Sequence, residues 1–355
     1  FKQKTAYEIR LSLVGSEMCI RDSCGVVSVM SGSVLPADAH GVSVAAAVLR
    51  GGGLVAFPTE TVYGLGANAL DARAVARVFQ AKARPGFDPL ITHLADAADL
   101  PRLVGRVPEM VSVLAERFWP GPLTLIVERP LAIPPIVTSG LDTMAVRVPD
   151  HCVARALIAQ AGVAVAAPSA NRFGRLSPTR AEHVVAGLGD AVDLILDGGP
   201  TRYGVESTIV DARAGHPVVR RLGALPVEAI AEVVGPLKIA LGGHGRPAAP
   251  GALAAHYAPS TPLRVLSDST SVPHHGGSLG YLAFRDRPRE EYAAIEVLAP
   301  DGDLTRAAAG LFDALHRLDA AGLTQILAER VPDTGLGQAI NDRLQRAAAT
   351  WRPDR

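Results

Sequence analysis

The sequence predicts an α/β protein built as two domains. Short apolar runs of strand length alternate with amphipathic helical segments up to about residue 235. A segment rich in glycine, proline and alanine follows at residues 242–254 and is typical of a linker. The alternation resumes on a smaller scale from Pro262, and a length of 355 residues suits two domains.

The larger domain opens with a helix, a strand and a second helix. Apolar residues recur at helical spacing over 36–50, and glycines 51–53 end that helix. The run 54–57 is apolar and bounded by glycine and proline, as in a short buried strand. Over 71–83 one face is apolar, and Pro85 follows two cationic side chains at the end of this helix.

The rest of the larger domain repeats the pattern of strand, polar loop and helix. Apolar runs predict the strands and amphipathic runs predict the helices. Ser177 and Thr179 are expected to cap the last helix. We expect strands at 89–94, 123–127, 144–148, 163–167, 192–196, 208–211 and 218–222, and helices at 101–118 with a break near Pro108, 150–160 and 182–188.

The smaller domain shows the same alternation of strands and helices, and its sequence indicates no catalytic or ligand-binding motif. Its apolar and amphipathic runs predict strands at 262–266, 279–284, 295–298 and 325–328, and helices at 304–321 and 339–350.

Composition excludes several classes of protein. Hydrophobic residues make up 48% and charged residues 20%, as in a folded globular protein. The formal net charge is zero, so any contact with nucleic acid must use a local patch. No apolar run approaches membrane-spanning length. Cysteines at 19, 24 and 152 form neither a disulfide framework nor a zinc pattern, so we expect free thiols in the cytoplasm.

The amino-terminal segment differs in composition from the rest. Of the four lysines in the chain, Lys2 and Lys4 lie within residues 1–23. We expect residues 1–30 to be a non-native or disordered extension, with Met30 as the native start; the intact mass of the protein from its source checks this.

A loop rich in hydroxyl groups follows the first strand. Residues 58–66 (PTETVYGLG) present three hydroxyls and a carboxylate, then two glycines that allow a tight turn or close approach of a ligand. Thr59 or Thr61 could instead cap a following helix. The run 64–69 also fits a dinucleotide fingerprint, but Lys82 and Arg84 stand where that motif requires an acidic residue.

Polar residues recur where the other strands end, so we expect them in one cleft. Arg147 is a charge within an apolar strand, which is costly unless it is paired or holds an anion. His93 ends another strand, although a lone histidine there is more often structural. The hydroxyls, amides and cations of this set suit the alignment of anions better than attack by a protein nucleophile.

Five motifs in this order resemble the YrdC/Sua5 family: PTETVYGLG, KARPGFDPLITH, GLDTMAVRVPDH, APSANRFGRLSPT and GVESTIVD. The resemblance implies a YrdC-like twisted α/β domain with a strand-end cleft at 37–235. The HYAP motif implies the two-domain Sua5 type, with a linker or lid at 236–260 and a smaller Rossmann-like α/β domain at 261–355.

The resemblance also implies a reaction, that of an L-threonylcarbamoyladenylate synthase. This nucleotidyltransferase converts L-threonine, bicarbonate and ATP into threonylcarbamoyl-AMP and pyrophosphate, with Mg²⁺ bridging the phosphates. Downstream tRNA-threonylcarbamoyl transferase proteins then use the product for t6A modification of tRNA, and contact with tRNA itself is a further expectation.

The family motifs imply roles for individual residues. Lys82 and Arg84 would face the phosphates as catalytic cations. The threonine site would consist of Thr61, His93, Arg147, Ala167 and Ser207. The ATP site would consist of Arg84, Asp88, Thr143, Ser169, Ser177, Arg221 and Tyr257, with Tyr257 closing over the nucleotide, and no protein ligand for a metal is expected.

Two positions depart from the family pattern: Asp88 stands where asparagine is expected, and residues 253–255 lack the usual methionine and basic residue. Two other functions stay open. One is a non-catalytic RNA-binding module, with Arg172, Arg175 and Arg180 on an open face. The other is carbamoyl transfer to another acceptor, as in hydrogenase-maturation proteins, whose longer chains carry zinc-finger-like cysteines.

Overall fold

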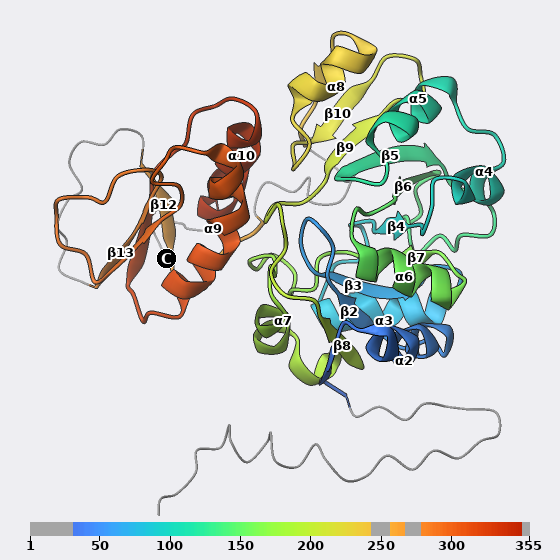
Figure 1. Cartoon of the computed structure of the whole chain (residues 1–355), viewed down its shortest axis with the longest axis horizontal. Helices are drawn as coiled ribbons and strands as arrows, with labels where there is room; N and C mark the ends of the chain where they lie inside the picture. Colours follow the sequence, from blue (N-terminus) through green and yellow to red (C-terminus); the bar gives the residue numbers. More distant parts are fainter. Residues whose placement is uncertain (1–30, 243–255, 267–277, 350–355) are drawn as a thin grey trace, which may run out of the picture.

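The computed structural model describes residues 31–242, 256–266 and 278–349, which fold as a larger and a smaller α/β domain (Figure 1). The α/β class predicted from the sequence is confirmed. The proposed extension at 1–30 and most of the linker, residues 243–255, lie outside the described residues. Within the described ranges, no helix combines the length and apolar character needed to cross a bilayer.

The larger domain is organised on one mixed sheet of 11 strands in the order β1-β8-β2-β3-β7-β4-β6-β5-β9-β10-β11. Its elements along the chain are β1 (Ser33–Pro36), α2 (Ala39–Arg50), β2 (Val55–Phe57), β3 (Gly64–Asn68), α3 (Ala72–Lys82), β4 (Ile91–His93), α4 (Asp99–Val104), α5 (Glu109–Phe118), β5 (Leu123–Glu128), β6 (Thr143–Arg147), α6 (Cys152–Ala161), β7 (Val165–Ala166), α7 (Ala181–Gly187), β8 (Leu194–Asp197), β9 (Thr208–Asp211), β10 (Val218–Arg221), α8 (Val227–Val234) and β11 (Lys238–Ile239).

Local sequence explains the helices that frame this sheet. Asp38 caps α2 by accepting a hydrogen bond from the backbone N–H of Gly41 at 2.8 Å. Asp71 caps α3 in the same way, through the N–H of Arg73 at 2.8 Å. Helix α2 packs on α6 and buries Leu49 and its apolar neighbours beneath the sheet. The predicted helices at 36–50 and 71–83 are therefore confirmed.

The two glycines after the hydroxyl-rich loop lie in strand β3 rather than in a turn that leads to a helix. A methyl group on Gly66 would lie 2.8 Å from Phe57 and from Val165, so the absence of a side chain permits close strand packing. The helix-capping interpretation of Thr59 is wrong, because a strand follows the loop. The dinucleotide interpretation is wrong for the same reason, since that motif needs a helix there.

The sheet register gathers polar strand ends, as the sequence predicted. Strands β4 and β6 are parallel and place His93 opposite Arg147. Strand β9 runs parallel to β5 and begins directly after Ser207. Because β5 is antiparallel to β6, the start of β9 lies at the same end of the sheet as the ends of β4 and β6, and so do the three residues.

The smaller domain is a four-stranded parallel sheet in the order β12-β15-β13-β14. It comprises β12 (Leu263–Val265), β13 (Leu279–Ala283), β14 (Ala294–Val297), α9 (Leu304–Asp319), β15 (Gln325–Ala328) and α10 (Leu336–Ala348). Helices α9 and α10 lie on the side of this sheet that faces the larger domain (Figure 1).

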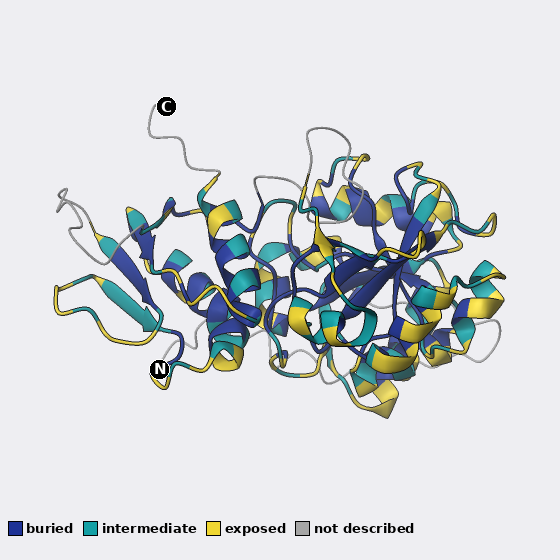
Figure 2. Ribbon diagram, turned by 90° about the horizontal axis from the view of Figure 1, so that it is seen from above, coloured by how far each residue is buried: buried dark blue, intermediate teal, exposed yellow. Residues whose placement is uncertain are grey.

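The two domains share an apolar core, and buried residues continue from one to the other in Figure 2. Val62 and Val205 of the larger domain belong to the same buried cluster as Leu311 and Phe312 of α9. Gly204 allows this close approach: a methyl group on it would lie 2.4 Å from the carbonyl oxygen of Ala308. The interface is thus tightly packed.

Two imidazole rings meet face to face in the same interface. His183 of α7 stacks on His316 of α9 with ring centroids 3.9 Å apart, and Asp313 lies 3.4 Å from His183 Nε2. Arg180 and Arg317 bind the same aspartate. Burial and the neighbouring His316 lower the pKa of His183 to about 4, so both rings are neutral at neutral pH.

This arrangement predicts loss of stability in acid. The unfolded chain binds a proton at His183 near pH 6.5, whereas the folded chain resists it down to about pH 4. We therefore expect the free energy of unfolding to be intact above pH 6.5 and to fall as the pH drops toward 4. Urea unfolding at a series of pH values checks this, and the decline should be shallower in His183→Gln. An equal slope in both proteins would contradict the assignment.

Candidate active site

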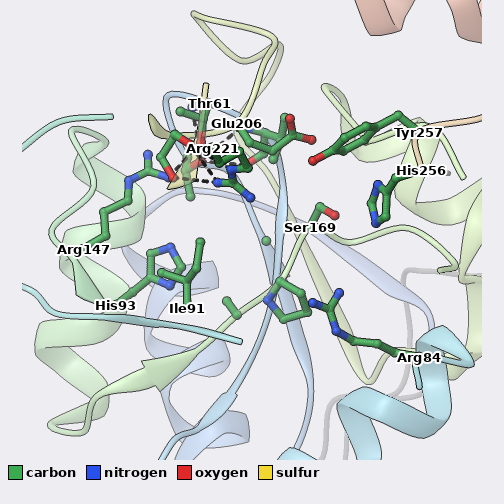
Figure 3. A pocket seen from close by; sticks show the side chains of 16 residues that line it. Thr61, Arg84, Ile91, His93, Arg147, Ser169, Glu206, Arg221, His256 and Tyr257 are labelled. Carbon is green, nitrogen blue, oxygen red and sulfur yellow. Dashed lines mark hydrogen bonds between the residues drawn. The ribbon is translucent and has the colours of Figure 1, made fainter. Parts of the chain in front are cut away.

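A pocket opens where the polar strand ends meet the residues that precede the smaller domain (Figure 3). It is lined by Thr59, Thr61, Val62, Gly64, Arg84, Ile91, His93, Arg147, Ala167, Pro168, Ser169, Glu206, Ser207, Arg221, His256 and Tyr257. Strand ends supply most of this wall, and Tyr257 and His256 stand on the opposite side.

The hydroxyl-rich loop is held by its own side chains. Thr59 Oγ1 accepts hydrogen bonds from the backbone N–H groups of Thr61 and Val62 at 3.2 and 3.3 Å. Thr61 Oγ1 lies 2.9 Å from Thr59 Oγ1 and accepts a hydrogen bond from Arg147 Nη1 at 3.0 Å. The loop therefore fixes one hydroxyl beside a guanidinium inside the pocket.

Arg147 is buried and paired. Its Nη2 lies 2.5 Å from Glu60 Oε1, and its Nε donates to the carbonyl of Gly121 at 3.2 Å. Two N–H groups, on Nε and Nη1, thus donate to the protein, whereas Nη2 contacts Glu60 as an ion pair without hydrogen-bond geometry. The other N–H groups, on Nη1 and Nη2, suit a carboxylate of a ligand, and no local pattern in the sequence indicated Glu60 as the partner.

His93 lies next to Arg147 and is uncharged. Burial and the Arg147 charge lower its pKa to about 3. Its ring stands edge-on to Phe57, with centroids 6.3 Å apart. A neutral imidazole does not repel an incoming ammonium or amine, so His93 suits the amino end of an amino acid.

Arg84 supplies a second cation on another wall. Its Nη2 lies 2.9 Å from Asp88 Oδ2, while its Nε and Nη2 donate to the carbonyls of Asp88 and Pro89 at 2.9 and 2.8 Å. Lys82 lies behind this wall, where its Nζ donates to the carbonyl of Ser169 at 2.6 Å and to that of Asn171. Lys82 therefore holds the segment that carries Ser169.

The pairing of Asp88 with Arg84 leads to a prediction. Asp88→Asn removes a buried negative charge but keeps the hydrogen bonds from Arg84 to backbone carbonyls. For the ATP that the family motifs imply as substrate, we expect the KM to fall roughly threefold, because the Arg84 charge is no longer compensated, and thermal stability to fall. Steady-state kinetics and thermal unfolding check this. A higher KM would instead show that the carboxylate assists nucleotide binding.

A third cation lies beside Ser207 on the pocket wall. Arg221 Nη2 donates to the carbonyl and the hydroxyl of Ser207 at 2.8 and 3.0 Å. Ser207 Oγ is also 2.7 Å from Thr124 Oγ1. Arg221 is buried, and burial lowers its pKa, yet its normal value is so high that it stays charged.

Most of the residues named from sequence meet in this pocket. Those that line it are Thr61, Arg84, His93, Arg147, Ala167, Ser169, Ser207, Arg221 and Tyr257. Lys82 and Asp88 stand directly behind it as partners of lining residues. Ser177 donates to Glu206 Oε1 at 2.5 Å instead of capping α7, and Thr143 lies at the far end of the five-residue strand β6 from Arg147.

Two protein-family models match this chain. Residues 47–223 match the Sua5/YciO/YrdC family model, described as telomere recombination. Residues 225–349 match the model described as threonylcarbamoyl-AMP synthase, C-terminal domain.

The chain belongs to the Sua5/YrdC family. The threonylcarbamoyl-AMP synthase of Bacillus subtilis is 44% identical over 321 residues, which cover 86% of this chain and 92% of that protein. The enzyme of the same name from Pyrococcus abyssi is 42% identical and is covered to 94%. The crystal structure of P. abyssi Sua5 with L-threonine superposes with a TM-score of 0.82 at 41% identity, covering 87% of this Sua5-type chain and 94% of that one.

Proposed function

We propose that the protein is a threonylcarbamoyl-AMP synthase, a nucleotidyltransferase that uses L-threonine, bicarbonate and ATP. The strongest support is the combination of side chains in one pocket. Arg147, Thr61 and His93 form a group that can hold an amino acid, and the same pocket is lined by Arg84 and Arg221. The names of the B. subtilis and P. abyssi relatives agree with this assignment.

The geometry suits recognition of L-threonine. The N–H groups on Nη1 and Nη2 of Arg147 that donate no hydrogen bond to the protein match a carboxylate. Neutral His93 beside it favours a neutral amine, which is the form that attacks bicarbonate. Carbamate formation joins the amine nitrogen to the bicarbonate carbon with loss of water.

The second step is adenylation. An oxygen of the carbamate attacks the α-phosphorus of ATP, and pyrophosphate leaves. Arg84 and Arg221 lie where they can neutralise the negative charge that gathers on the phosphates. The protein thus aligns two anions and offers cations, without a covalent intermediate on a side chain.

Mg²⁺ would enter with the nucleotide, bound by phosphate oxygens and water, as this ion prefers. Among the described residues, no group of three or more His, Cys, Asp or Glu forms a metal site of its own. Glu206 is the carboxylate that lines the pocket, and it is bound by Ser177 and by an arginine from the smaller domain. We therefore propose that phosphate oxygens and water are the ligands of Mg²⁺.

The product would serve t6A formation on tRNA through separate threonylcarbamoyl transferase proteins in the cytoplasm. The alternative of a non-catalytic RNA-binding module relied on three arginines. Arg172 donates to the carbonyl of Gly187, Arg175 to Ser260 Oγ, and Arg180 pairs with Asp313. All three arginines therefore have partners within the protein, which favours the enzyme over the RNA-binding module.

The test is turnover of purified protein with ATP, bicarbonate and Mg²⁺, with and without L-threonine. We expect pyrophosphate release that depends on threonine, together with a product of the mass of threonylcarbamoyl-AMP. Bound ATP without such turnover in a folded protein would overturn the assignment and favour the RNA-binding alternative.

A further inference from the structure

Helix α10 brings a charged side chain of the smaller domain to the active site, where the sequence predicted no chemistry. Arg343 is only 1% exposed. Its Nε donates to Glu206 Oε2 at 2.7 Å, and its Nη2 donates to the carbonyl of Leu222 at 2.8 Å. Both acceptors belong to the larger domain, so this guanidinium spans the domain interface.

Glu206 is the acidic group that this contact engages, and it lines the pocket. Its Oε1 accepts from Ser177 and its Oε2 from Arg343. Burial would raise the pKa of Glu206, but Arg343 and Arg221 outweigh it and lower the pKa, so the carboxylate is ionised. An ionised carboxylate in a pocket for ATP repels the phosphates unless a cation compensates it.

Arg343 also contacts the pocket wall that Tyr257 provides. The guanidinium carbon lies 4.8 Å from the centre of the Tyr257 ring, within the range of a cation–π contact. Tyr257 has a φ of 64°, a left-handed conformation that a non-glycine residue adopts only when its surroundings hold it. Arg343 is thus one of the contacts that hold Tyr257.

We propose that Arg343 is a positioning residue of the nucleotide subsite, which neutralises Glu206 and holds Tyr257 so that the smaller domain completes the active site. This inference rests on the proposed function, because it assigns the pocket beside Glu206 to ATP. The alternative is a buried ion pair that only joins the domains.

Charged residues near Arg343 keep other partners when Arg343 or Glu206 is replaced, so these substitutions disturb few other ion pairs. In Arg343→Met, Asp342 keeps a partner, since Arg346 Nε lies 2.9 Å from it. In Glu206→Gln, Arg343 keeps Asp342 at 2.6 Å. The substitution Arg343→Met therefore removes the arginine that contacts Glu206 directly, while Arg221 still acts on this carboxylate, and the double variant removes the Glu206 charge too.

We expect Arg343→Met to raise the KM for ATP at least tenfold and to change the KM for zwitterionic L-threonine by less than threefold, since the phosphates bear the repelled charge. Arg343→Met/Glu206→Gln should recover most of the ATP affinity. Arg306→Met serves as the matched control, because this arginine of α9 is exposed and pairs with exposed Asp301 within the smaller domain.

Direct binding of a non-hydrolysable ATP analogue, measured by calorimetry on the same four proteins, separates the two proposals. If the wild-type protein binds the analogue but makes no product, the proposed function fails, and the rescue in binding still decides the role of Arg343. Equal loss of affinity for both substrates, or no rescue by Glu206→Gln, would overturn the role of Arg343. Should Arg343→Met not fold, Arg343→Lys, which keeps the charge, is measured with and without Glu206→Gln.

Discussion

Arg147→Met is expected to lower kcat/KM for L-threonine at least 100-fold. The substitution removes the N–H pair available to the threonine carboxylate and breaks the buried contact with Glu60 at 2.5 Å. Truncation of one partner of a buried, hydrogen-bonded charge pair costs binding roughly 2–5 kcal/mol, and about 1.4 kcal/mol corresponds to a factor of ten. Steady-state kinetics at saturating ATP measure the loss.

Arg147→Lys separates the two consequences of that change. Lysine keeps a positive charge near Glu60, so thermal stability should lie close to that of the wild type. It lacks the planar fork, so the KM for threonine should still rise more than tenfold. A lysine variant with normal threonine kinetics would show that Arg147 acts through charge alone and does not clamp the carboxylate.

Arg84→Met is expected to lower kcat/KM for ATP by about 100-fold, while the KM for L-threonine changes little. Arg84 is a pocket cation on the wall that contains Ser169, and loss of one such stabilising group typically costs 10²–10³ in rate. The substitution also leaves buried Asp88 without its 2.9 Å partner, which lowers stability.

The double variant Arg84→Met/Asp88→Asn distinguishes these effects. Removal of the Asp88 charge, which no longer has Arg84 beside it, should restore much of the thermal stability but not the ATP kinetics. If the double variant regained normal turnover, Arg84 would be a structural partner of Asp88 and not a group that acts on the phosphates.

The arrangement of the pocket followed from the sequence where local rules applied. Apolar runs located the strands, and parallel pairing of β4 with β6 had to bring His93 and Arg147 to the same end of the sheet. The motifs then assigned these residues to a ligand. The same reasoning expected Gly66 to allow a tight turn or the close approach of a ligand, whereas in the structure it permits close packing in β3.

Partners of the charged residues could not be predicted, because they depend on contacts between distant segments. Glu60 and Arg147 are 87 positions apart, and Glu206 and Arg343 are 137 positions apart. No hydrophobic periodicity or motif spacing in the sequence indicates that such residues contact each other. Arg343 was missed for this reason, since on helix α10 alone it resembles an ordinary surface arginine of an amphipathic helix.

Tyr257 contacts the pocket on one side and Arg343 on the other. A ligand that is stabilised by this tyrosine therefore also stabilises the docked position of the smaller domain. Thermodynamic linkage makes the effect reciprocal: the factor by which docking tightens nucleotide binding is the factor by which nucleotide tightens docking. On this assignment, a macromolecule that binds the smaller domain preferentially in its docked position would raise the affinity for ATP without contacting the nucleotide.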